Sequence, residues 1–150
     1  MSCPICMWGL HIFASQDDVY YYVGMKKNKV AIIEDDSVIS QMYRTKFELE
    51  GFDVEIAGDG EVGIELVKEF TPDIVLLDVR MPKMSGDEAL KEIRKHSWGK
   101  DVPVLVLTNT GKDESLAAFK PLGIVDFIIK ADYTPKDVVA KVKEVLKKSK

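Results

Sequence analysis

From Lys29 onward, short apolar runs alternate with longer segments in which apolar residues recur at helical spacing. A short apolar run bounded by turn residues is typical of a strand buried on both faces of a parallel sheet. Such runs predict five strands, at residues 29–34, 52–57, 73–79, 102–109 and 124–130. The intervening and final segments predict five helices, at residues 37–51, 60–70, 87–96, 112–123 and 134–148. This alternation predicts an α/β protein with a five-stranded parallel sheet and helices on both faces.

Two of the predicted helices carry clear signals at their ends. Thr134 is expected to cap the last helix, with Pro135 at its first position and Asp137 completing a capping box. The fourth helix is expected to be short, because Pro121 and Gly123 break its helical pattern.

Ionisable and hydroxyl side chains gather where the predicted strands end. In a parallel α/β sheet the ligand crevice lies beyond the carboxyl ends of the strands. Buried carboxylates are costly unless positive charge meets them, so acids at this edge indicate a functional site. The residues concerned are Glu34 and Asp35 after the first strand, Asp78 at the third, Thr108 at the fourth and Lys130 at the fifth.

Composition narrows the class of protein. The 150 residues suffice for one domain with a core, and the 46% apolar and 31% charged fractions are those of a globular chain. A net charge of −4 argues against nucleic-acid binding by bulk electrostatics. No apolar run approaches the roughly 20 residues of a membrane-spanning helix. The cysteines, Cys3 and Cys6, are too few for a disulfide framework, and they indicate a reducing, cytoplasmic location.

Four motifs stand in order along the chain: "IIEDD", "DIVLLDVRMPKMSG", "VLVLTN" and "DFIIK". These motifs, and the intervals between Asp35, Asp78, Thr108 and Lys130, resemble the receiver domain of two-component response regulators, the family that includes the chemotaxis regulators. The resemblance covers residues 29 to about 148. It implies a doubly wound, flavodoxin-like fold with strand order 2-1-3-4-5, a bound Mg²⁺, and phosphorylation of one aspartate.

The resemblance also implies roles for the acids. Asp78 is expected to accept the phosphoryl group from a phosphohistidine and to ligate Mg²⁺ together with Asp35. Glu34 is expected to act on the ion mostly through water, and the carbonyl oxygen of Arg80 is inferred from its position to be a further ligand. Spacing to Asp78 assigns Asp36 to the N-cap of the following helix instead.

The remaining expectations concern the conformational response. Lys130 is expected to pair with Asp78 before phosphorylation and with a phosphoryl oxygen afterwards. Thr108 is expected to donate its hydroxyl to the phosphoryl group, a contact able to shift a two-state equilibrium. Phe127 matches the family's switch aromatic, and Gly86 is expected where the backbone adopts a conformation that other residues disfavour.

Two positions depart from the family pattern. Ala131 follows Lys130 where family members commonly have a proline after a cis peptide bond, so a trans bond is expected here. Asn109 follows Thr108 where the residue is usually small, and its bulk is expected to restrict access to the phosphoryl pocket.

Residues 1–28 precede the expected receiver at residues 29–150, and the pattern leaves open an unstructured extension or an upstream start. The segment lacks the basic start of a signal peptide. Its Cys3 and Cys6 form half a zinc site without a second pair.

The sequence thus predicts a stand-alone response regulator receiver, a signalling switch rather than an enzyme. Its expected partners are a sensor histidine kinase or phosphotransfer protein and an unidentified downstream protein, with no direct nucleic acid or membrane. It is expected to be a monomer or a phosphorylation-dependent homodimer. Alternatives are a small Mg²⁺-dependent phosphatase, although Arg80 cannot be its general acid, and a degenerate receiver acting as a constitutive binding module. A flavin-binding protein would need a phosphate loop after the first strand, which is missing.

Overall fold

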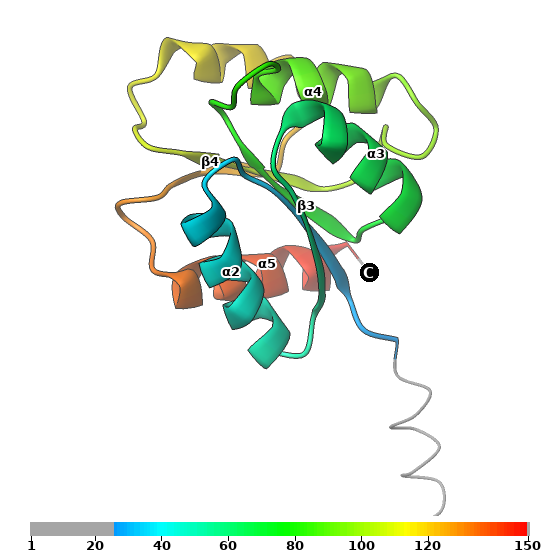
Figure 1. The fold of residues 1–150 in the computed structure, drawn as a ribbon, viewed down its shortest axis with the longest axis vertical. Helices are drawn as coiled ribbons and strands as arrows, with labels where there is room; N and C mark the ends of the chain where they lie inside the picture. The colour runs from blue at the N-terminus through cyan, green and yellow to red at the C-terminus, as the bar shows by residue number, and fades with distance from the viewer. Residues whose placement is uncertain (1–25, 150) are drawn as a thin grey trace, which may run out of the picture.

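A five-stranded parallel sheet lies at the centre of the computed structural model, which describes residues 26–149 (Figure 1). The strand order is β2-β1-β3-β4-β5, which confirms the predicted doubly wound topology. All four neighbouring pairs are parallel. The strands are β1 (Lys29–Ile33), β2 (Asp53–Ala57), β3 (Ile74–Asp78), β4 (Val104–Thr108) and β5 (Asp126–Ile129).

Helices cover both faces of the sheet, as Figure 1 shows. One face carries α2 (Ser37–Leu49) and α5 (Pro135–Lys148), and the other carries α3 (Gly60–Phe70), α4 (Gly86–Arg94) and the 3₁₀ helix η2 (Glu114–Leu122). Successive strand residues point to opposite faces and so enter two separate cores. In β1, Val30 and Ile32 join the core under α2 and α5, whereas Ala31 and Ile33 join the other.

The predicted caps are present. The Asp36 side chain accepts hydrogen bonds from the backbone N–H groups of Val38 and Ile39, so it occupies the N-cap of α2. Thr134 and Asp137 form the reciprocal bonds of a capping box at the start of α5. These bonds satisfy backbone donors that a helix start would otherwise leave free.

The fourth predicted helix is wound more tightly than expected. Residues 114–122 form 3₁₀ turns rather than α-helix, and Gly123 ends them with φ of 69°. Pro121 lies inside this element. Proline has no N–H to donate and its ring clashes with the carbonyl group four residues earlier, which disfavours regular α-helix here.

One arginine ties η2 to the loop before β4. The guanidinium of Arg94 donates to the carbonyl oxygens of Gly99 and Val102, each at 2.8 Å, and of Leu122 at 2.8 Å and Gly123 at 3.2 Å. Nothing in the sequence pattern indicates this contact, because carbonyl acceptors carry no side-chain signature. The bonds hold the end of η2 against the end of α4.

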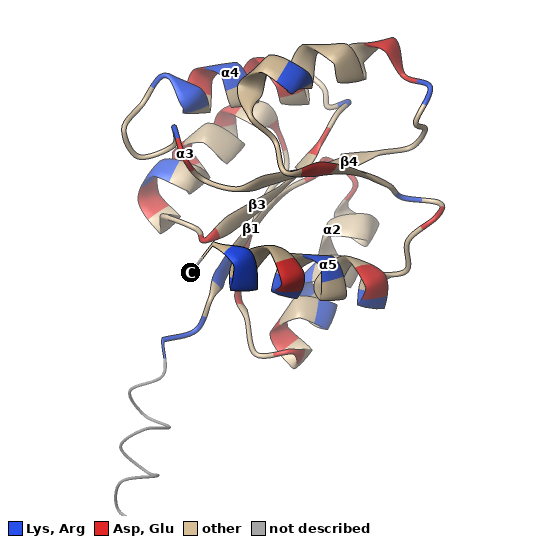
Figure 2. Ribbon diagram, turned by 180° about the vertical axis from the view of Figure 1, so that it is seen from behind, with Lys and Arg blue, Asp and Glu red and all other residues tan. Residues whose placement is uncertain are grey.

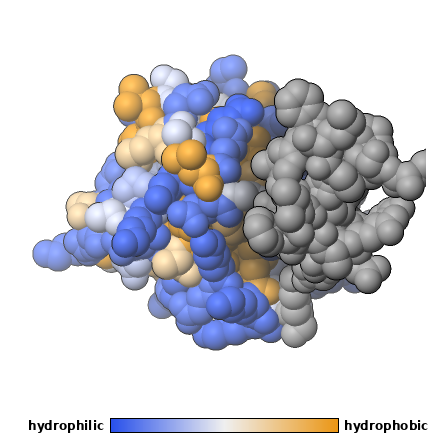
Figure 3. All heavy atoms as spheres, turned by 90° about the horizontal axis from the view of Figure 1, so that it is seen from below, coloured by the Kyte–Doolittle hydropathy of each residue, from blue (hydrophilic) through white to orange (hydrophobic). Residues whose placement is uncertain are grey.

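The outer surface is mixed in charge. Figure 2 shows basic and acidic residues side by side along α5, and Figure 3 shows the described atoms mainly hydrophilic when seen from below. Within residues 26–149, no helix combines the length and apolarity that crossing a membrane requires. The predicted extension at residues 1–28, with Cys3 and Cys6, falls almost entirely outside the described residues.

Candidate functional site

Four strands bring the predicted site residues to the same edge of the sheet. Glu34 directly follows β1, Asp78 ends β3, Thr108 ends β4 and Lys130 directly follows β5. The parallel pairing places these strand ends next to one another, with Asp78 opposite Leu107 on β4. The fold therefore brings residues up to 96 positions apart in the sequence into contact.

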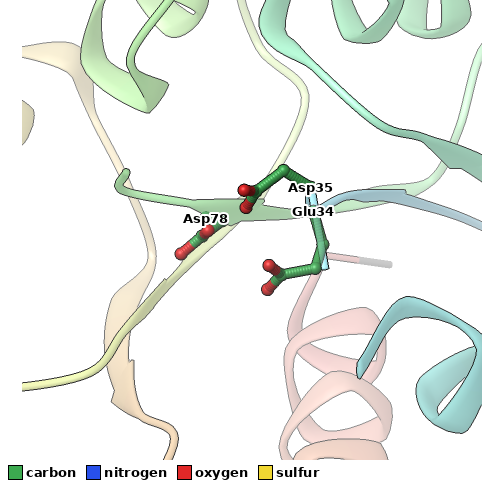
Figure 4. Close-up of side chains that lie close together, drawn as sticks. All are labelled: Glu34, Asp35 and Asp78. Carbon is green, nitrogen blue, oxygen red and sulfur yellow. The ribbon is translucent and has the colours of Figure 1, made fainter. Parts of the chain in front are cut away.

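Three carboxylates converge at this edge. Oxygen atoms of Glu34, Asp35 and Asp78 all lie within 4.8 Å of one another. Figure 4 shows the Glu34 and Asp35 side chains reaching from the end of β1 toward Asp78. Glu34 and Asp78 are buried, whereas Asp35 is exposed to solvent. Grouped carboxylate oxygens suit a hard divalent cation such as Mg²⁺, which uses one or two carboxylates and keeps several waters.

Lys130 supplies the positive charge at this cluster. Its ammonium group lies 2.5 Å from Glu34 Oε2 and 3.2 Å from Asp78 Oδ1. The Lys130 side chain is only 12% exposed, so these ion pairs are shielded from water. Pairing with Asp78 agrees with the expectation, whereas the closer contact with Glu34 was not anticipated. Lys130 and Ala131 are joined by a trans bond, since no peptide bond in the described residues is cis.

Burial and neighbouring charges shift the pKa values of Asp78 and Lys130. Desolvation, followed by the negative charge of Glu34, raises the pKa of Asp78 from 3.8 to about 7, although Lys130 opposes the shift. Burial disfavours the charged form of Lys130, but its bonds to Glu34 and Asp78 outweigh this and raise its pKa. The single ammonium group thus does not balance the three carboxylates, and a divalent cation could supply the missing positive charge.

This raised pKa predicts how the stability of the metal-free protein varies with pH. Unfolded Asp78 ionises near its ordinary pKa of 3.8, whereas folded Asp78 ionises only near 7. The stabilisation that comes from protonated Asp78 is therefore fully present below the pKa of the unfolded state. It is lost as the pH rises through the pKa of the folded state. We expect Asp78→Asn to stabilise the protein relative to wild type by a few kcal/mol, on the order of 2–4, at pH 8 and by little at pH 4.

Urea unfolding of both proteins at pH 4, 5.5 and 8, with a chelator present, measures this difference. Asp36→Asn is the matched control, since asparagine also caps helices and Asp36 lies outside the three-carboxylate cluster. A stability difference between Asp78→Asn and wild type that stays constant with pH would contradict the expectation.

A hollow of about 300 Å³ lies beside Asp78, and Thr108 is part of its wall. The buried Thr108 hydroxyl donates to the carbonyl oxygen of Thr110 at 2.8 Å. Asn109 also lines the hollow, with an exposed side chain. The hydroxyl must therefore leave Thr110 before it can donate to a group bound at Asp78.

The Phe127 side chain is half-buried in the adjacent strand, β5. It packs edge-on against Phe119 of η2, with ring centroids 6.1 Å apart. Phe119 itself is fully buried. The ring of Phe127 thus connects β5 to η2, and its switch role stays a prediction.

Gly86 is required for space, and the expectation of an unusual backbone conformation is wrong. Among the described glycines only Gly51 and Gly123 have positive φ. A Cβ atom at Gly86 would lie 2.2 Å from the carbonyl oxygen of Asp78 and 3.2 Å from Val79 Cα. The Gly86 N–H also donates to the Val79 carbonyl at 2.9 Å. The start of α4 therefore packs directly against the backbone of Asp78.

Arg80 makes a contact that the sequence pattern does not indicate. Its Nε donates to Asp113 Oδ2 at 2.9 Å, across 33 residues of chain, and both residues line the hollow beside Asp78. Hydrogen bonds from Arg80, and then from Ser115, hold the pKa of Asp113 well below its usual range. The predicted role of the Arg80 carbonyl oxygen as a metal ligand is separate from this side-chain contact.

The fold and this cleft define a class of protein: a doubly wound α/β domain with an acidic, lysine-containing site at the carboxyl edge of its sheet. Residues 30–143 match the model of the response regulator receiver domain. The chain belongs to this family, whose members are signalling switches of two-component systems, phosphorylated on aspartate and binding Mg²⁺ in the acidic pocket.

Similar proteins support the assignment. The "Transcriptional regulatory protein CpxR homolog" of Haemophilus influenzae is 38% identical over 81% of this chain and 52% of its own length. A "Probable transcriptional regulator ycf27" of Guillardia theta is 35% identical over 82% of this chain and 47% of its own. The chain therefore spans about half the length of these curated relatives.

Solved structures agree with the fold. Chemotaxis protein CheY4 of Vibrio cholerae has a TM-score of 0.74 and 28% identity, with 80% of this chain and 99% of that chain covered. A CheY-like receiver domain protein of Methanospirillum hungatei has a TM-score of 0.75 and 25% identity, with coverage of 82% and 96%. The similarity to these proteins extends over nearly their whole length.

Proposed function

We propose that this chain accepts a phosphoryl group on the Asp78 carboxylate from a phosphohistidine, in a reaction that depends on Mg²⁺. The observation that supports this most directly is the convergence of Glu34, Asp35 and Asp78 within 4.8 Å, with the Lys130 ammonium 3.2 Å from Asp78. A carboxylate can act as the nucleophile that forms an aspartyl phosphate. The hollow of about 300 Å³ beside Asp78 offers room for the incoming group.

The residues fit the metal that the family binds. Glu34, Asp35 and Asp78, together with the carbonyl oxygen of Arg80, are the groups that would hold Mg²⁺. When bound, the ion would offset the charge of the carboxylates and of the phosphoryl oxygens. The raised pKa of Asp78 is consistent with a site whose positive charge is incomplete without a divalent cation.

The transfer forms one bond and breaks one. A carboxylate oxygen of Asp78 attacks phosphorus, and the bond from phosphorus to the donor imidazole nitrogen breaks, with the electron pair leaving on that nitrogen. Because the nucleophile and the phosphoryl group are both anionic, positioning and charge dominate the barrier. Lys130 is placed to hold Asp78 before transfer and to meet a phosphoryl oxygen afterwards.

The conformational response would begin at Thr108. Its hydroxyl would exchange the Thr110 carbonyl for a phosphoryl oxygen, a contact that exists only in the phosphorylated state. Phe127 would then turn inward as the neighbouring strand end moves, and the surface around η2, β5 and α5 would change. This surface is the expected binding site for a downstream protein, or for a second copy of the chain in a phosphorylation-dependent homodimer.

The phosphoryl donor would be a sensor histidine kinase or a phosphotransfer protein, since receiver domains interact with these proteins. The relatives named as transcriptional regulators are about twice as long as the matched region. Stand-alone action therefore stays a prediction, and the proposal concerns the receiver itself.

Intact-mass measurement after incubation with acetyl phosphate and Mg²⁺ tests this function. We expect one phosphate adduct on the wild-type protein, labile to base, and none on Asp78→Asn. Asp36→Asn is the matched control, because it removes a neighbouring acid that caps α2, and its adduct should form as in wild type.

Other outcomes would favour the alternatives. Rapid release of phosphate without an adduct would favour a phosphatase. Failure of the wild-type protein to form an adduct with any donor would favour a constitutive binding module and overturn the proposal.

A further inference from the structure

An ion pair connects the residue two positions after Asp78 to the start of η2. Arg80 Nε lies 2.9 Å from Asp113 Oδ2, and we refer to this pair as the Arg80–Asp113 bridge. Asp113 also caps η2, because its Oδ1 accepts from the N–H of Ser115 at 3.0 Å and from the Ser115 hydroxyl at 2.7 Å. The bridge therefore joins the loop that carries the phosphoacceptor to the first turn of a neighbouring helix.

Both partners lie beside the place where a phosphoryl group would sit. Arg80 and Asp113 line the same hollow as Asp78 and Thr108. A phosphoryl group carries about two negative charges near neutral pH and offers three acceptor oxygens. The guanidinium group has five donors arranged to bind such oxygens in pairs. A phosphoryl group on Asp78 would therefore compete with Asp113 for Arg80.

Exposure indicates which partner moves. The Arg80 side chain is 78% exposed, whereas that of Asp113 is 6% exposed and is held by Ser115. Reorientation of Arg80 costs little because water can solvate it throughout. Asp113 cannot follow without giving up its cap on η2. In this exchange the Arg80 side chain would therefore change position, while Asp113 would stay in place.

We propose that the Arg80–Asp113 bridge is a latch that the phosphoryl group opens: Arg80 leaves Asp113, binds the phosphoryl oxygens on Asp78, and thereby frees the start of η2. This inference rests on the proposed phosphorylation of Asp78. It assigns to Arg80 a second role, through its side chain, as a positioning residue whose partner depends on the state of the site. It also makes Asp113 an antagonist of phosphorylation.

The two partners then have opposite effects, which a merely structural ion pair would not produce. Asp113→Asn keeps the helix cap, since asparagine caps as well as aspartate, but removes the charge that competes for Arg80. Arg80→Gln removes the guanidinium group that would bind the phosphoryl oxygens. We expect Asp113→Asn to tighten binding of beryllofluoride, a phosphoryl mimic, by about threefold with Mg²⁺ present, and Arg80→Gln to weaken it by about threefold.

A double-mutant cycle sharpens the test. In the Arg80→Gln background, Asp113→Asn should change beryllofluoride affinity by less than about 1.5-fold, because no bridge is left to break. Glu50→Gln is the matched control. It removes surface ion pairs with Lys143 at 2.7 Å and Lys46 at 3.4 Å, and none of these residues lines the hollow. Its affinity should equal that of wild type.

Nuclear magnetic resonance of the Arg80 Nε–H group gives a second readout. We expect its resonance to shift in Asp113→Asn and, in wild type, on addition of beryllofluoride. If both single variants leave the affinity unchanged or shift it in the same direction, the latch is overturned while the proposed phosphorylation stands. If the wild-type protein binds no beryllofluoride and forms no adduct with acetyl phosphate, the proposed function fails, and the latch fails with it.

Discussion

Gly86→Ala is expected to lower the free energy of unfolding by about 3 kcal/mol and to slow phosphorylation of Asp78. The added Cβ would lie 2.2 Å from the Asp78 carbonyl oxygen and 3.1 Å from its carbonyl carbon, and neither backbone atom can turn aside as a side chain would. Relief of the clash must displace either the start of α4 or the end of β3. It would also strain the bond from the Gly86 N–H to the Val79 carbonyl oxygen. Urea unfolding and the rate of adduct formation with acetyl phosphate measure the two effects.

Gly58→Ala provides the matched control. Gly58 lies in the exposed loop after β2, and a Cβ atom there would meet no atom within 4 Å. We expect its stability to change by less than about 0.5 kcal/mol. Alanine favours helix over glycine by up to about 1 kcal/mol, so propensity alone would make Gly86→Ala stabilising. A stable, normally phosphorylated Gly86→Ala protein would show that the contact with Asp78 is relaxed at no cost.

Lys130→Met is expected to destabilise the metal-free protein by about 3 kcal/mol at pH 8. The substitution keeps most of the length and much of the apolar stem of the side chain but removes the ammonium group that contacts both Glu34 and Asp78. Two buried carboxylates are then left without their cation. Their repulsion and desolvation are relieved when they take up protons, so the loss should shrink as pH falls toward 4. Urea unfolding across this pH range, with a chelator, measures the effect.

Lys141→Met separates this effect from the general loss of a lysine. Lys141 pairs with Asp126 at 3.0 Å, but the side chains are 27% and 48% exposed. Exposed pairs of this kind contribute less than about 1 kcal/mol, so this variant should lose little stability at any pH. We also expect millimolar Mg²⁺ to restore part of the stability of Lys130→Met, because the ion stabilises the folded state that binds it. Equal, pH-independent losses in both variants would argue against a charge role for Lys130.

The sheet and its helices could be predicted because their signals are local. The apolar run before Glu34 and the helical spacing after Asp36 both lie within a few residues of the chain. The capping box of Thr134 and Asp137 is likewise contained in four positions. The site edge followed from one topological rule, namely that parallel strands bring their carboxyl ends together. That rule needs only the strand ends, and these were correct to within a few residues.

The contacts that escaped prediction depend on how loops meet in space. The Arg80–Asp113 bridge joins two loops 33 residues apart, and each residue alone looks like an ordinary surface charge. Gly86 was assigned to an unusual backbone conformation because glycine signals either that or close approach, and only coordinates distinguish the two. The 3₁₀ form of η2 could not be predicted either, because the effect of Pro121 on the preceding turns depends on the packing around them.

The bonds of Arg94 fix the last residues of η2 in place. The guanidinium grips the carbonyl oxygens of Leu122 and Gly123, whereas the other end of η2 is held through Asp113. If a phosphoryl group on Asp78 releases the Asp113 end as proposed, Arg94 would keep the Leu122 end in place, so any displacement of η2 would be largest near Glu114. Amide hydrogen exchange is then expected to quicken on phosphorylation in the first turn of η2 and to stay slow in the last turn, where Arg94 holds the backbone.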